Sequence, residues 1–106
     1  MTGVVWPGSE VGESIQFSLD RFDPRSYLYF VDECVYVSHI HATTMGQGYF
    51  HDLVQQLQAR GLTIKVPAPY QRMEKILRHY GARPIIEFDL RMGPCEVWVL
   101  LPPEDN

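Results

Sequence analysis

Two glycines and two histidines within residues 39–48 have types and spacing suited to chemistry. Gly46 and Gly48 flank the single residue Gln47, directly before a helical pattern begins. The first N–H groups of a helix have no partner within the helix and carry the positive end of its dipole. Glycines before such an end let an anion approach the main chain. A pyrophosphate would suit this turn, and the same pattern also fits a simple tight turn.

The histidines are candidates for a general base. His39 and His41 lie two residues apart in an expected strand, so both side chains project from one face. An imidazole has a pKa of about 6.5, which suits proton transfer at neutral pH. His41 is the first choice because it is closer to the glycine turn. The alternatives are half-exposed polar residues at a strand end, or a weakly supported metal site with His51; we expect no metal.

Composition limits the class of protein. The 106 residues, 45% apolar and 21% charged, predict one globular domain. The net charge of −4 argues against nucleic-acid binding. No apolar run approaches the about 20 residues of a membrane span and no secretory signal begins the chain, so we expect a cytoplasmic protein without a membrane partner. Cys34 and Cys95 are expected to be reduced thiols, with a disulfide left open.

Periodicity predicts the elements that must position these residues. Apolar residues at Phe50, Leu53, Val54 and Leu57 have helical spacing, and Gly61 follows as a stop signal. A second helix of the same kind is expected between Pro69 and Gly81. The expected strands are 14–22, 26–31, 34–42, 62–66, 85–90 and 95–101.

These elements predict a mixed α/β fold of one domain. Their order is β-β-β-α-β-α-β-β, and the strand–helix–strand unit at 34–66 is expected to be a right-handed parallel crossover. The hairpins on either side of this unit are antiparallel, so the sheet of about six strands should be mixed and mostly antiparallel, with two helices. Residues 1–13 are expected to be a flexible arm, 14–101 the domain and 102–106 an acidic tail.

The sequence resembles a known superfamily. The element order and the stretches "TTMGQGYFHDLVQQLQARGLTIKV" and "MEKILRHYGARPIIEF" are similar to the GNAT superfamily of acyl-CoA-dependent N-acetyltransferases. Gly46 and Gly48 fall on the two small positions of that family's Gln/Arg-x-x-Gly-x-Gly/Ala turn, and Gly81 falls on its helix-ending glycine. The resemblance covers about residues 14–101, with the recognisable motif at 43–50. It is strongest to very short members, some of them viral, that lack the N-terminal helices.

The resemblance implies acetyl-CoA as cofactor and direct attack of an amine on its thioester, with a base and often an acid moving protons. It also implies that the pantetheine arm pairs with the strand end and that main-chain N–H groups of the turn hold the pyrophosphate. The implied cofactor-binding residues are Ile40, His41, Ala42, Met45, Gly46, Gln47, Gly48 and Tyr49.

The chain departs from the family at several side chains. Thr43 stands at the Gln/Arg position, and Leu77 stands where the family has the tyrosine that acts as acid. Tyr70 is near the asparagine position of the second helix, and Ser38 is near the position of a carboxylate. His41 and His39 are then the candidate catalytic residues. The chain is either an N-acetyltransferase for an amine, with an open acceptor side that favours a protein substrate, or a degenerate relative that binds another protein.

Two further features concern partners. Basic residues recur every three positions at Arg72, Lys75 and Arg78, with Arg83 beyond; they suit a cofactor 3′-phosphate, an acidic partner or simply a solvated helix face. The strand at 95–101, which contains Trp98, is almost continuously apolar. Such a strand is expected to be buried on both faces, so we predict a second copy of the chain against it and hence a homodimer.

Overall fold

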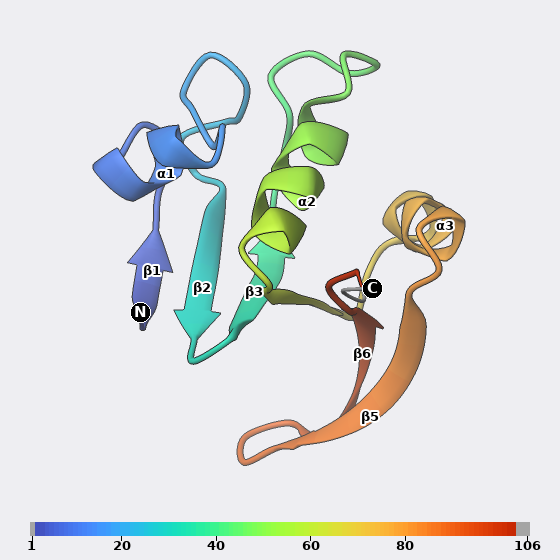
Figure 1. Cartoon of the computed structure of the whole chain (residues 1–106). Helices are drawn as coiled ribbons and strands as arrows, with labels where there is room; N and C mark the ends of the chain where they lie inside the picture. The colour runs from blue at the N-terminus through green and yellow to red at the C-terminus, as the bar shows by residue number, and fades with distance from the viewer. Residues whose placement is uncertain (1, 104–106) are drawn as a thin grey trace.

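One six-stranded sheet and three helices form the fold in the computed structural model, which describes residues 2–103 (Figure 1). The expected end of the acidic tail, residues 104–106, lies outside the described residues, as does residue 1. The elements in chain order are β1 (Gly3–Val5), α1 (Glu10–Ser14), β2 (Tyr27–Val31), β3 (Cys34–His39), α2 (Tyr49–Ala59), β4 (Thr63–Pro67), α3 (Gln71–His79), β5 (Arg83–Asp89) and β6 (Gly93–Leu100).

The sheet is mixed and mostly antiparallel, which confirms the predicted class. Its strand order is β1-β2-β3-β4-β6-β5, and only β3 and β4 pair in parallel. The parallel register runs from Cys34 opposite Thr63 to Tyr36 opposite Lys65 and goes no further. β3 continues to His39, but its residues after Tyr36 do not pair with β4. The carboxyl ends of the two strands therefore separate.

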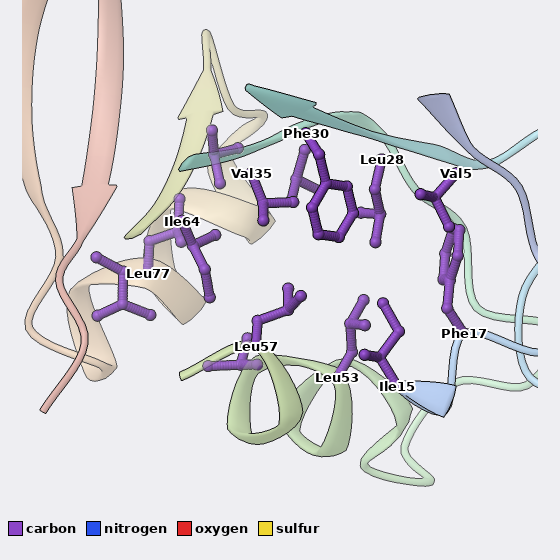
Figure 2. Close-up of a cluster of buried hydrophobic side chains, with 14 of the residues drawn as sticks. Val5, Ile15, Phe17, Leu28, Phe30, Val35, Leu53, Leu57, Ile64 and Leu77 are labelled. Atoms are coloured by element: carbon purple, nitrogen blue, oxygen red, sulfur yellow. The ribbon is translucent and has the colours of Figure 1, made fainter. Parts of the chain in front are cut away.

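The core lies between the sheet and the apolar side of α2 (Figure 2). Leu53, Val54 and Leu57 are the buried residues of α2, at the helical spacing read from the sequence. Leu53 and Leu57 face Val35 of β3 and Ile64 of β4, which are fully buried. Burying a side chain of this size stabilises the fold by about 1.5–3 kcal/mol, so this cluster fixes α2 on the parallel pair.

The N-terminal quarter differs from the sequence prediction. The segment 1–13, expected to be a flexible arm, contains a strand from its third residue: β1 pairs antiparallel with β2 and thereby forms one edge of the sheet. The short helix α1 follows, with the Ser9 side chain accepting a hydrogen bond from the Gly12 N–H. Gly12 lies so close to other main-chain atoms that an added Cβ would come within 2.7 Å of the carbonyl oxygens of Trp6 and Phe17.

The expected strand at 14–22 is wrong. Ile15 and Phe17 are buried as the alternation implied, but Leu19 is 55% exposed. Between the two buried residues, Gln16 has a φ of 64°, a left-handed conformation outside the range of a regular strand. The alternation comes from a loop that folds back on α1, where the Phe17 N–H donates to the Gly12 carbonyl.

An ionic network ties β5 to the middle of the sheet on the face without helices. The Tyr36 hydroxyl donates to Glu87 Oε1 at 3.1 Å, and Lys65 Nζ lies 2.6 Å from Glu87 Oε2. Glu87 thus reaches across β6 to contact β4 and β3. The hydrogen bond from Lys65 lowers the pKa of the Glu87 carboxyl, and the same bond raises the pKa of Lys65.

Glu87→Gln is expected to reduce the free energy of unfolding by about 1 kcal/mol at neutral pH, because it removes a charged pair that is partly shielded from water. A carboxyl with a lowered folded-state pKa stabilises the fold above its ordinary pKa of 4.5 and stops doing so as the pH falls through the folded value. Urea unfolding at several pH values should therefore show the difference from wild type shrinking below pH 4.5. A difference that is constant into strong acid would contradict this account, and Glu33→Gln, at an exposed turn, is the control.

Candidate functional site

A cleft of about 660 Å³ opens beside the separated ends of β3 and β4. Its walls are the segment that follows β3, the glycine turn before α2, and α3. All eight residues that the resemblance gave as cofactor-binding lie on this cleft: Ile40, His41, Ala42, Met45, Gly46, Gln47, Gly48 and Tyr49. A smaller cleft adjoins it between His39 and the loop after β4.

The glycine turn leaves its main chain accessible. Gly46 and Gly48 have φ values of 79° and 73°, and an added Cβ would meet nothing within 4 Å at either position. The turn conformation, rather than a close neighbour, therefore requires glycine. Among the hydrogen bonds of residues 2–103, none is donated by the N–H of Met45, Gly46 or Gly48. Gly48 also supplies no side-chain cap to α2, so the helix dipole faces the cleft directly.

The extension of β3 is held from one side only. The His41 N–H donates to the Oγ of the fully buried Ser26 at 2.9 Å, and the Asp23 N–H donates to the His41 carbonyl at 2.8 Å. Two residues on, the Thr43 N–H donates to the Arg21 carbonyl. These bonds attach the extension to the loop that precedes β2.

The opposite edge of the extension faces the cleft. In extended chain, alternate residues direct their main-chain groups to opposite sides. Because His41 and Thr43 bond to the preceding loop, Ile40 and Ala42 direct theirs to the other side, and both line the cleft. Outside the helices and ladders of residues 2–103, no hydrogen bond uses the main chain of either residue. An extended ligand could therefore pair with this edge as a strand would.

The two histidines lie side by side, as their spacing predicts, with ring centroids 4.8 Å apart. Both side chains are exposed. His41 lines the large cleft, whereas His39 lines only the smaller one and stacks on Tyr27. Of the two candidate bases, His41 is thus the one that faces the glycine turn's cleft.

The cleft also contains a phenol, Tyr80, which was not among the predicted site residues. Tyr80 at the end of α3 contacts His51 in the first turn of α2, with its hydroxyl 2.5 Å from His51 Nδ1. Burial, helped by the negative charge of Asp52, raises the pKa of Tyr80, so the hydroxyl holds its proton at neutral pH. Leu77, at the position where the resembled family has its acid, is buried in the core and has no ionisable group.

The basic residues of α3 separate in the structure. Arg72 lines the cleft, with Nη1 3.3 Å from Met45 Sδ in the glycine turn. Arg78 instead pairs with Glu74 and lies over the ring of Trp98. Arg72 thus adds a positive charge to the cleft next to the glycine turn that precedes the N-terminus of α2.

Comparison with known proteins gives no relative: no family model, curated protein or solved structure matches this chain. In residues 2–103, no three His, Cys, Asp or Glu side chains are grouped so as to hold a metal ion. None of the described helices has the length and apolarity to cross a membrane. The arrangement of the cleft itself must therefore carry the functional argument.

The left-handed conformation of Gly48 should make the stability of the fold sensitive to substitution at this position. Gly48→Ala should destabilise the protein by about 1 kcal/mol, since a Cβ is disfavoured at this φ although it has space. Gly48→Asn should cost less, because asparagine tolerates this conformation. Thermal or urea unfolding measures both, and equal effects of Ala and Asn would contradict the assigned backbone geometry.

Proposed function

We propose that the protein is an acetyl-CoA-dependent N-acetyltransferase of GNAT-like fold that acts on an amine of another protein. One observation carries the proposal: the unbonded N–H groups of the glycine turn and the unpaired edge at Ile40 and Ala42 border the same cleft. The first feature suits a pyrophosphate and the second suits an extended arm with amide groups. Acetyl-CoA contains both, in that order, and the sequence resemblance points to the same cofactor.

Each part of the cleft has a role in holding the cofactor. The N–H groups of residues 45–49 bind the pyrophosphate, supported by the dipole of α2 and by the charge of Arg72. The main-chain groups of Ile40 and Ala42 bind the pantetheine amides. Bound acetyl-CoA supplies an acetyl group activated as a thioester.

Proton transfer depends on side chains of this chain. An acceptor lysine arrives as an ammonium ion and must lose a proton before its nitrogen is nucleophilic. His41 is exposed on the cleft and accepts that proton, with His39 beside it as a second imidazole. Tyr80 keeps a proton on its hydroxyl at neutral pH and is the acid available in the cleft.

The shape of the acceptor side favours a macromolecular substrate. None of residues 2–21 lines the cleft, and β1 lies at the edge of the sheet opposite β5 (Figure 1). The acceptor side is therefore without a cover from this segment and suits a side chain presented by a folded protein. Such an enzyme would work in the cytoplasm, where its two free thiols stay reduced.

A second candidate is a protein of the same fold that binds a partner without catalysis. Leu77 is buried where the family has its acid, and the Thr43 hydroxyl donates a hydrogen bond to the Asp20 carbonyl at 2.7 Å. These observations favour a degenerate member. Binding of acetyl-CoA followed by turnover distinguishes the two candidates.

Titration calorimetry should detect micromolar binding of acetyl-CoA. Gly46→Glu is expected to abolish it, because a carboxylate would stand where the pyrophosphate binds. Gly61→Glu is the matched control: Gly61 has a φ of 73° and equally open space, but it lies at the other end of α2. Absence of binding at millimolar acetyl-CoA, or equal losses in both variants, would reject the cofactor site.

His41→Ala should lower acetyl transfer to a lysine peptide about tenfold or more at neutral pH, while acetyl-CoA affinity changes little. Raising the pH toward the pKa of the lysine should recover part of the rate, because the amine then needs no base. A rate that falls equally at every pH would mean that His41 has only a structural role.

A further inference from the structure

β5, the strand at one edge of the sheet, exposes a row of apolar side chains. β5 ends the strand order, with β6 on one side and no strand of residues 2–103 on the other. Ile86, Phe88 and Leu90 are 68%, 74% and 97% exposed. Figure 1 shows the β5–β6 hairpin extending away from α3, and the exposed fractions place this row in contact with solvent. A long edge strand with exposed apolar side chains is a template for pairing with another strand.

The register shows which main-chain groups are open. The Ala68 N–H donates to the Glu96 carbonyl, so Glu96 bonds toward β4 rather than toward β5. Glu96 stands opposite Ile86. Because Glu96 bonds toward β4, the two residues form a non-hydrogen-bonded pair, in which each directs its main-chain N–H and carbonyl away from the other. Ile86 therefore presents its N–H and carbonyl to the open edge. Phe88, two residues on, also presents its main-chain groups to the open edge. Pro84, two residues before Ile86, has the same orientation, so its missing N–H costs no bond to β6.

The strand is complementary to itself. We propose that β5 pairs antiparallel with β5 of a second copy of this chain, about a two-fold axis at Ile86. In that register Arg83 stands opposite the second copy's Asp89, and Pro84 stands opposite its Phe88. Ile86 meets its own equivalent. Two copies thus gain two opposite-charge pairs, a shared apolar row on one face and main-chain hydrogen bonds from Ile86 and Phe88.

Charge distinguishes this register from its neighbours. An axis at Glu87 would set Glu87 against Glu87, and an axis at Phe88 would set Glu87 against Asp89; like charges opposite each other destabilise a ladder. An axis at Ile85 would set Arg83 against Glu87, which Lys65 already neutralises within the chain. The axis at Ile86 instead gives Arg83 the carboxylate of Asp89.

This surface differs from the one that the sequence predicted. The expected dimer contact was the apolar strand around Trp98, but Val97 and Trp98 are 2% and 3% exposed within a single chain. Arg78 of α3 covers the Trp98 ring. Within one chain that strand is already covered, and the uncovered apolar row lies one strand further out, on β5.

Disulfide cross-linking tests both the dimer and its register, in the full chain with Cys34→Ser and Cys95→Ser. With the axis at Ile86, Ile86→Cys brings two equivalent Cα atoms within about 5.5 Å, a distance that a disulfide spans. Leu90→Cys is the control: position 90 is more exposed, but the two copies of it would be about 26 Å apart along the strands. Mild oxidation should cross-link Ile86→Cys and not Leu90→Cys.

A second variant tests the main-chain pairing. Ile86→Pro removes an N–H that no β6 residue uses, so the monomer should still fold, with unchanged circular dichroism. The dimer should dissociate about tenfold or more readily, because each copy loses an edge hydrogen bond. Light scattering over a dilution series measures the mass. A wild type that is monomeric throughout, equal cross-linking at positions 86 and 90, or a dimer unaffected by Ile86→Pro would overturn the proposal.

Discussion

Burial of one apolar side of α2 against the parallel strands β3 and β4 is the contact on which the rest of the structure depends. Leu53 and Leu57 point from α2 toward Val35 and Ile64 of the sheet. Because these side chains are fully buried, α2 cannot shift without opening the core. Its first turn, and the glycine turn before it, are held at the point where β3 and β4 separate. The position of the cleft is therefore a consequence of core packing.

The local parts of the site could be predicted from the sequence, and the long-range parts could not. The helices at 49–59 and 71–79 follow from apolar spacing with glycines after them, and the turn before α2 follows from two glycines that are close in sequence. The contact between His51 and Tyr80 joins residues 29 positions apart. It depends on how α2 and α3 pack, and nothing in the spacing of either residue encodes that.

The N-terminal segment was mispredicted for a related reason. A strand of three residues and a helix of five are too short to produce a period, and their stability comes from pairing with β2 and from the close approach at Gly12. The alternation of Ile15 and Phe17 imitates a strand because a loop with one left-handed residue can also direct alternate side chains inward. The net charge of the chain did not predict the charge of the site. The chain is acidic overall, whereas the cleft is lined by Arg72 and faces the positive N-terminal end of α2.

The strand order β4-β6-β5 has a consequence for the growing polypeptide. β6, the strand that neighbours β4, is synthesised after β5, so β4 has one bare edge until residues 93–100 have been made. β5 leaves the ribosome earlier but has no place in the sheet without β6, so the two strands must join β4 together as a ready-made hairpin. A message truncated after residue 89 would release a chain that holds every residue lining the cleft and yet carries two unsatisfied strands, a product suited to aggregation and degradation.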